Sequence, residues 1–208
     1  MKQLALTALI VPLVLGSCSS TRYGDPKGVE TVNIDWGSTD LQTFSEKMVK
    51  SLLEAPQLAY LNTSGKGDDK RIIAYMGGVR NDTSEHINLE AVTDSIRTEL
   101  IRSSKFRFVA DTKGQNEIGD QVRFQNESGR VNPEMAKKFG KQLGADVVLY
   151  GTLSSIEKKK GRSIESAGTK TEDVYYQFVL NCVNIETGEI IWSDKGDIRK
   201  TQKTGIFG

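Results

Sequence analysis

Hydrophobic and polar residues alternate along the last third of the chain, as they do in β-strands. Residues 144–153 are rich in β-branched and aromatic side chains, which predicts a central strand. Residues 174–183 alternate between a more apolar and a more polar set, and a tight turn at 186–188 leads into a third strand over 189–193. The unequal faces predict antiparallel strands with helices packed on one side.

Apolar residues three or four positions apart predict two helices upstream of these strands. The first runs over 40–55, with Ser38 or Thr39 as its cap and Pro56 as its stop. The second follows Asn88 as N-cap and carries an apolar stripe as far as Leu100. Both stripes indicate helices that cover one face of the sheet.

A third helix is predicted over 132–143. It begins with Asn132 and with Pro133 at the first helical position, and Gly144 ends it. Three apolar residues at helical spacing are expected to point inward, namely Met135, Phe139 and Leu143. Residues 112–124 fit either a short helix or a loop.

Two shorter strands complete the predicted sheet, over 71–76 and 105–109. Gly77 and Gly78 follow the first of them and mark either a bulge or the end of the strand. The element order is helix, strand, helix, strand, helix and then three strands. This order predicts the α/β class, with one domain built on a small mixed β-sheet flanked by helices.

The N-terminus has the features of a secretory signal peptide. Lys2 precedes about a dozen mostly apolar residues, fewer than the ~20 that span a bilayer. Residues 15–18 read Leu-Gly-Ser-Cys and resemble a bacterial lipobox, which predicts cleavage before Cys18 and lipidation of its thiol. Ser19 stands where an aspartate would resemble an inner-membrane retention signal. The expected location is therefore the outer membrane, lipid-anchored and facing the periplasm.

These signals divide the chain into a signal peptide (1–17), a short flexible tether (18–38) and one α/β domain (39–208). Removing residues 1–17 takes away Lys2 and no acidic residue from a chain with 28 Lys plus Arg and 27 Asp plus Glu. The mature protein is thus neutral, which argues against nucleic acid as a partner.

Catalytic and metal-binding patterns are not found in the sequence. His86, the single histidine, lies in a polar turn and is expected to be solvated, as are the acidic pairs at 68–69 and 172–173. Cys182 lies among apolar residues of a strand and is expected to be a buried small hydrophobe. We therefore predict no enzymatic activity, no cofactor and no metal site.

Two features of the surface could serve a partner protein. Four basic residues begin the loop expected between the two long strands, namely Lys158, Lys159, Lys160 and Arg162. They form either a solvated hairpin tip or a docking patch for an acidic protein surface. Trp192 is either part of the core, which we favour, or a half-exposed anchor at an interface.

The lipobox and two segments of the domain resemble the LpoB family of outer-membrane lipoproteins, which activate class A penicillin-binding proteins. The segments are 144–151 and, most specifically, Glu-Thr-Gly-Glu-Ile-Ile-Trp-Ser-Asp-Lys-Gly over 186–196. The resemblance implies a fold like the TolB N-terminal domain, with no active site of its own. It also implies contact with a docking domain of an inner-membrane peptidoglycan synthase, whose glycosyltransferase and transpeptidase activities the lipoprotein stimulates.

By the same resemblance, Glu189 and Arg130 are candidate contacts with the synthase. The chain departs from the enterobacterial pattern by lacking a long Pro-rich linker and by carrying the longer basic loop. Two alternatives stay open, a CsgG-like secretion or structural lipoprotein and a wall-binding scaffold. The first requires hairpins of alternating apolar residues, which 161–173 does not supply.

Overall fold

The structure is a computed structural model of the 208-residue chain. It describes residues 24–26, 28–30, 33–138, 142, 144–162 and 168–205. The predicted signal peptide and Cys18 lie outside the described residues, as do Phe139 and Leu143.

The described elements follow the predicted order of helix, strand, helix, strand, helix and three strands. They are α1 (Ser38–Leu53), the 3-10 helix η1 (Pro56–Tyr60), β1 (Ile72–Asp82), α2 (Leu89–Arg102), β2 (Phe106–Phe108), α3 (Thr112–Glu127), β3 (Val147–Lys160), β4 (Lys170–Asn184) and β5 (Ile190–Thr204).

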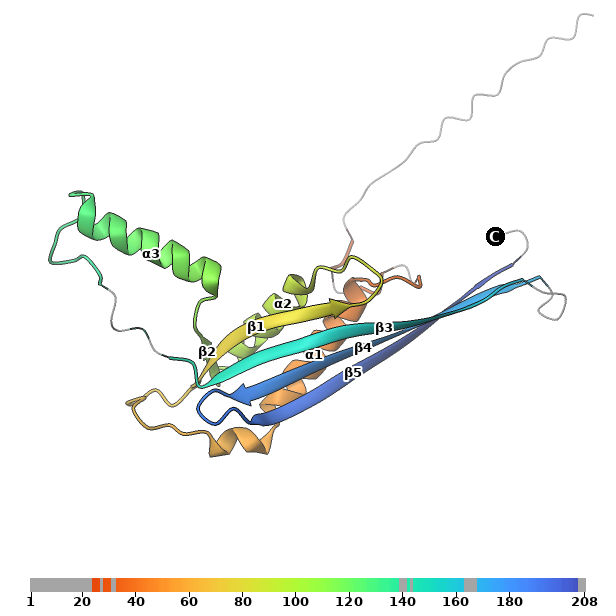
Figure 1. Cartoon of the computed structure of the whole chain (residues 1–208), viewed down its shortest axis with the longest axis horizontal. Helices are drawn as coiled ribbons and strands as arrows, with labels where there is room; N and C mark the ends of the chain where they lie inside the picture. Colours follow the sequence, from red (N-terminus) through yellow and green to blue (C-terminus); the bar gives the residue numbers. More distant parts are fainter. Residues whose placement is uncertain are drawn as a thin grey trace, which may run out of the picture.

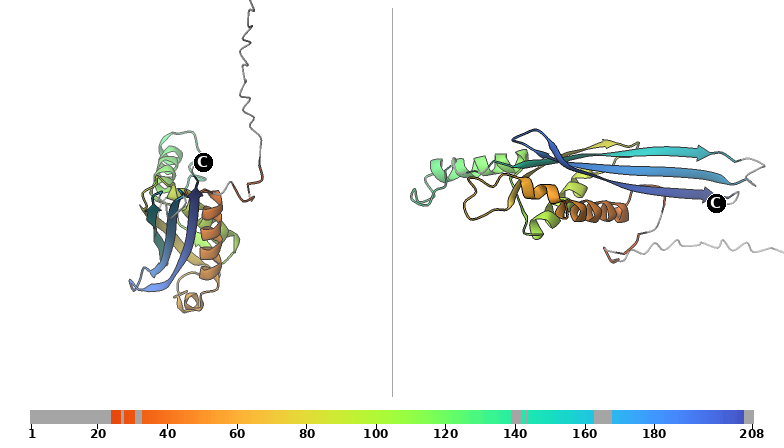
Figure 2. Two further views of the ribbon diagram at one scale, coloured as in Figure 1. Left: turned by 90° about the vertical axis from the view of Figure 1, so that its right-hand side faces the viewer. Right: turned by 90° about the horizontal axis from the view of Figure 1, so that it is seen from below.

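The five strands form one mixed sheet in the order β2-β1-β3-β4-β5. β1 pairs in parallel with β2 and β3, whereas β3, β4 and β5 form an antiparallel meander. α1 and α2 lie side by side on one face of this sheet, and none of the described helices covers its other face (Figures 1 and 2). The α/β class and the mixed sheet are therefore confirmed.

α1 packs onto the sheet through its predicted apolar stripe. Phe44, Met48 and Leu52 are buried against the strands. The helix is capped differently from our prediction, because Gly37 is the N-cap and the Asp40 carboxylate accepts a hydrogen bond from its N–H at 2.9 Å. α2 begins as predicted, with the Asn88 side chain accepting from the Glu90 N–H at 3.1 Å.

The Gly77-Gly78 pair forms a bulge within β1 and does not end the strand. The register of β1 against β3 shifts between Met76 and Val79, and pairing then continues to Asp82. A Cβ added at Gly77 would lie 2.8 Å from the carbonyl oxygen of Leu149. The glycine therefore lets two backbones approach closely at the bulge.

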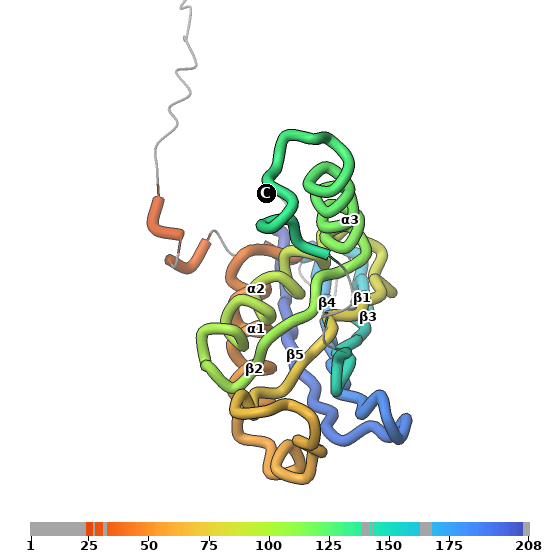
Figure 3. Tube along the Cα trace, turned by 90° about the vertical axis from the view of Figure 1, so that its left-hand side faces the viewer, coloured from red at the N-terminus to blue at the C-terminus, as the bar shows by residue number. Residues whose placement is uncertain are grey.

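Over 132–138, the continuous described part of the segment where we predicted the third helix, no helix forms. Residues 133–135 make a turn, and the following described residues are irregular. Met135, which we expected to point inward, is 70% exposed. The helix at this place in the order is α3, which contains no buried residue and stands away from α1 and α2 (Figure 3).

The last three strands are longer than their apolar alternation predicts. β3 continues to Lys160, β4 begins at Lys170 and β5 extends to Thr204. The basic run that we placed in a loop therefore belongs mostly to β3. The acidic pair Glu172-Asp173, which we also placed in a loop, lies in β4 and pairs with that run.

Candidate partner-binding surfaces

The ends of β3, β4 and β5 form a projecting three-stranded arm. β1 pairs with β3 no further than Ser154, so the strands beyond this point have no neighbour on the β3 side. We call residues 155–162, 168–176 and 198–205 the arm. Figure 1 and the right-hand view of Figure 2 show it extending past both helices that cover the sheet.

Acidic residues of the arm neutralise part of its basic run. Glu172 lies 3.0 Å from the Lys170 ammonium and 3.7 Å from that of Lys159, and Lys159 also lies 3.7 Å from Glu157. The hydrogen bond from Lys170, with support from Lys159, holds the pKa of Glu172 below its usual value. The arm therefore carries a mixture of basic and acidic side chains and not a uniform basic patch.

Other cations of the arm have no carboxylate within 4.0 Å in the part of the chain that the structure describes. They are Lys158, Lys160, Arg162, Arg199 and Lys203. Arg162 donates a hydrogen bond to the Gly205 carbonyl at 3.0 Å and so joins the end of β3 to the end of β5. The remaining four are available to an acidic partner.

A hollow of about 400 Å³ lies on the arm, on the face of the sheet that faces away from α1. Five residues line it, namely Ile156, Lys158, Asp173, Tyr175 and Arg199. We call these five residues the arm site. They share a face because Ile156 and Arg199 are each in register with Tyr175, and Lys158 is in register with Asp173.

Hydrogen bonds fix the ring of Tyr175 in the arm site. Its hydroxyl donates to Asp197 at 2.8 Å, and the Gln177 amide donates to the same carboxylate at 3.1 Å. These bonds, with Tyr175 as the main contributor, lower the pKa of Asp197. Asp197 also pairs with Lys195 at 3.2 Å, whereas the Arg199 guanidinium lies 5.9 Å from the centre of the Tyr175 ring.

The β4–β5 turn carries the first candidate contact named by resemblance. Gly188 adopts a positive φ of 74° in this turn, as the sequence predicts for a tight turn. Glu189 is exposed, and its neighbour Ile190 and nearby Ile185 are exposed apolar residues. The Glu189 carboxylate makes no hydrogen bond or ion pair with any described residue.

The candidate residues are not brought together into one site. Arg130 is exposed and follows α3, and Figure 1 shows α3 and the β4–β5 turn at the same end of the molecule. Lys158, Lys159, Lys160 and Arg162 lie at the other end, on the arm. The chain therefore offers two separate surfaces, the turn and the arm.

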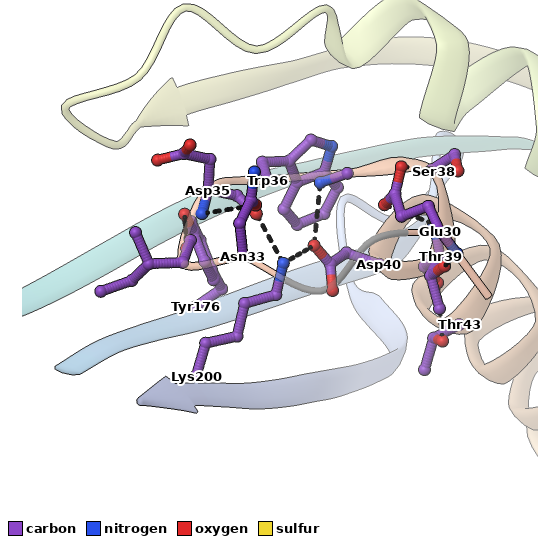
Figure 4. Close-up of polar contacts among 12 residues, drawn as sticks. Glu30, Asn33, Asp35, Trp36, Ser38, Thr39, Asp40, Thr43, Tyr176 and Lys200 are labelled. Atoms are coloured by element: carbon purple, nitrogen blue, oxygen red, sulfur yellow. Dashed lines mark hydrogen bonds and ion pairs between the residues drawn. The ribbon is translucent and has the colours of Figure 1, made fainter. Parts of the chain in front are cut away.

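A set of polar and aromatic contacts attaches residues 33–37 to the domain (Figure 4). We call these contacts the clasp. Trp36 stacks on Phe44 with ring centres 5.5 Å apart and meets Tyr176 edge-on at 5.6 Å. The backbone N–H of Trp36 donates to the Glu85 carboxylate at 3.0 Å, and the Tyr176 hydroxyl lies within hydrogen-bond distance of the same carboxylate.

Lys200 completes the clasp from β5. Its ammonium lies 2.6 Å from the Asp40 carboxylate and donates to the Asp35 carbonyl at 2.5 Å. The two side chains are only 14% and 7% exposed, so this ion pair is almost fully buried. Nothing in the sequence identified Lys200 as the partner of this segment.

The remaining chemical candidates are structural. Cys182 is fully buried, and burial raises the pKa of its thiol to about 12. Trp192 is buried in the core, and His86 is exposed. Asp69 is not merely solvated, because it pairs with Arg71 at 2.7 Å and with Arg107 at 3.1 Å.

The described residues contain neither a metal-binding cluster nor a membrane-spanning helix. Nowhere in these residues do three or more His, Cys, Asp or Glu gather closely enough to hold a metal ion. None of the helices described here combines the length and the apolar character needed to cross a membrane.

The fold and its surfaces define a class of protein, a single α/β domain that presents an exposed turn and a projecting arm to its surroundings. The family model described as "Peptidoglycan-synthase activator LpoB" matches residues 40–198, from the first turn of α1 into the arm part of β5. The chain therefore belongs to the LpoB family.

The chain is also similar to individual LpoB proteins. The "Penicillin-binding protein activator LpoB" of Photorhabdus laumondii is 26% identical over 167 residues, which cover 80% of this chain and 71% of the relative. Among solved structures, the LpoB C-terminal domain from Salmonella enterica is 19% identical, with a TM-score of 0.43 over 76% of this chain and 98% of that domain. The Escherichia coli domain is 20% identical, with a TM-score of 0.41 and the same coverage.

Proposed function

We propose that this protein is an outer-membrane lipoprotein that binds a class A penicillin-binding protein and activates it in cell-wall synthesis. The match to the family over residues 40–198 is the observation that carries the proposal. The name of the Photorhabdus relative supports a penicillin-binding protein as the partner. The lipobox that ends at Cys18 supports the anchor and the periplasmic location.

Activation by this domain would follow from binding alone. A partner that binds the active conformation of a synthase more tightly than the resting conformation shifts the population toward the active one. The free carboxylate of Glu189, beside the exposed Ile190, is a suitable contact for such a partner. Arg130 is the second candidate at the same end of the molecule.

Glycan polymerisation by the cognate class A synthase, with and without the purified lipoprotein, tests this proposal. We expect the lipoprotein to bind the synthase in a pull-down and to increase the rate of polymerisation. The variant Glu189→Lys should weaken both effects, whereas Glu134→Lys, at an exposed position after α3, serves as its control. Binding to peptidoglycan without any gain in synthase rate would contradict activation and favour a wall-binding scaffold.

A further inference from the structure

We propose that the arm site binds an acidic peptide segment of the protein that this domain activates, as a second contact separate from the β4–β5 turn. The inference rests on the proposed function for the identity of the partner. Two cations without a carboxylate partner within 4.0 Å among the described residues, Lys158 and Arg199, line one hollow with the exposed Ile156 and with Tyr175.

The chemistry of the arm site defines what it can hold. Ile156 is 64% exposed and offers an apolar surface, and the Tyr175 ring is held in place by its bond to Asp197. Carboxylates placed near Lys158 and Arg199 would gain charge-assisted hydrogen bonds that these side chains lack within the described structure. A peptide that carries acidic residues next to an apolar one matches both the cations and the apolar surface of the arm site. The hollow of about 400 Å³ accommodates only a few side chains of such a peptide.

Charges inside the hollow argue against an anionic membrane as the occupant. Asp173 lines the site itself, and Asp197, the hydrogen-bond partner of Tyr175, lies two positions from Arg199 on the same face of β5. A dense anionic surface would meet these carboxylates as well as the cations, whereas a peptide can direct its acidic groups to Lys158 and Arg199 alone. The neutral charge of the mature chain likewise gives no overall attraction to such a surface.

Binding of the full-length lipoprotein, in detergent, to the cognate class A synthase tests the arm site. The double variant Lys158→Glu/Arg199→Glu removes no side-chain ion pair or hydrogen bond between described residues, and it removes only the contact of Arg199 with the Tyr175 ring. We expect its affinity to fall at least about tenfold, with a weaker dependence on salt. The control Lys113→Glu/Lys138→Glu makes the same change of charge at exposed positions and should stay within about twofold of the unchanged protein.

The pattern of results separates the two proposals. If the unchanged lipoprotein binds and activates the synthase and the arm variant does so equally well, the arm site is wrong and the proposed function stands. If the unchanged lipoprotein does not bind the synthase, both are wrong. If the arm variant and its control lose affinity equally, the loss follows from the change in net charge alone, and the arm site is overturned. Binding to phosphatidylglycerol vesicles that is lost only in the arm variant would overturn the peptide as occupant.

A cross-linking experiment tests the chemistry of the bound segment. A photoreactive p-benzoylphenylalanine in place of Ile156 should cross-link to the synthase, and the captured peptide should contain Asp or Glu. Ile101, an exposed isoleucine of α2, provides the matched position at which no cross-link is expected. A captured segment without acidic residues, or equal cross-linking from both positions, would overturn the proposal.

Discussion

At the scale of single residues, Gly196 decides how closely α1 can approach β5. A Cβ at this position would lie 2.4 Å from Cδ1 of Phe44, whose ring packs between Trp36 and Phe178. Since both neighbours confine that ring, it has little room to move away. The chain therefore has glycine at a buried strand position where a larger side chain would otherwise be expected.

We predict that Gly196→Ala lowers the free energy of unfolding by about 2 kcal/mol, because the added methyl group overpacks the contact with Phe44. Urea denaturation followed by tryptophan fluorescence measures the change. Gly161→Ala is the control, since a Cβ at Gly161 meets no atom within 4 Å. Equal stability of the two variants would show that α1 shifts without cost.

Cys182 is the second residue whose behaviour follows from its place in the core. Its thiol is fully buried, and its pKa is raised from 9.0 to about 12 by burial. Reaction with a disulfide reagent requires the thiolate and access to it. With Cys18→Ser leaving a single thiol, we predict that the folded chain reacts at pH 8 at least about a thousandfold more slowly than the chain in urea.

The raised pKa also predicts the direction of a pH effect on stability. Between about pH 9 and pH 12 the unfolded chain loses the Cys182 proton while the folded chain keeps it, so stability is full below this range and declines through it. The midpoint of unfolding should be lower at pH 10 than at pH 8, and Cys182→Ala should reduce this difference. In the labelling experiment described above, a rate for folded Cys182 within tenfold of the rate in urea would contradict the burial of its thiol.

At the scale of elements, the clasp joins the segment before α1 to the start of the arm. Tyr176 comes from β4 and Lys200 from β5, and both contact residues 33–40. The chain leading to the predicted anchor is therefore attached to the domain next to the arm. The predicted tether ends at residue 38, but the contacts of Trp36 and Asp35 hold its last residues against the domain.

We predict that Lys200→Met lowers the free energy of unfolding by about 3 kcal/mol, because it leaves the Asp40 carboxylate buried without its counter-charge. Lys203→Met, at an exposed position of the same strand, is the control and should change the free energy by less than about 0.5 kcal/mol. Chemical denaturation of both variants gives the comparison. A loss no greater than that of the control would mean that the clasp contributes nothing to stability.

α3 is a helix that the core of the domain does not stabilise, because none of its residues is buried. Its N-terminus is capped by Asp111, whose side chain accepts from the Gly114 N–H at 2.8 Å, yet none of its residues is buried. The Asn126 side chain donates to the Lys137 carbonyl at 2.9 Å, which ties the segment after the helix back to its C-terminal turn. Local capping and these returning bonds, and not a core contact, define this helix.

At the scale of the whole molecule, the two candidate surfaces lie at opposite ends of the β4–β5 hairpin, and the clasp lies between them (Figure 1). Hydrogen bonds of Glu30 with Ser38 and Thr39 attach the chain to the start of α1, which leaves about 12 residues after Cys18 and a reach of at most ~43 Å when fully extended. A tether that runs over 18–38, as the sequence predicts, would reach about 65–70 Å when fully extended. With the proposed anchor at Cys18, the start of the folded domain lies within this shorter distance of the membrane.

We predict that Cys18→Ala releases the protein from the membrane fraction of the cell, because the lipid attached to Cys18 is its proposed anchor. Fractionation with antibody detection measures the change, and Ser17→Ala, which leaves the cysteine in place, is the control. The purified Cys18→Ala chain should still activate the synthase in detergent solution, since the domain is unchanged. Membrane association that survives the substitution would contradict the lipid anchor.

Local patterns in the sequence determined the α/β class, the element order, and the faces of α1 and α2 that become buried. They also placed Cys182 in the core and a turn at Gly188, because helical spacing, strand alternation and turn chemistry are properties of neighbouring residues. The bulge at Gly77 was one of two interpretations, and the register shift in β1 decided it. The family resemblance rested on equally local segments.

Only the tertiary structure decided which polar segments become strands, which predicted helix fails to form and which distant residues meet. Lys158 looks like a loop residue until its pairing with Asp173 is known, because a charged strand is stabilised by its neighbour and not by its own sequence. Met135 has helical spacing but no surface to pack against. Ile156, Tyr175 and Arg199 share one hollow solely because strand register aligns three segments that are far apart in the chain.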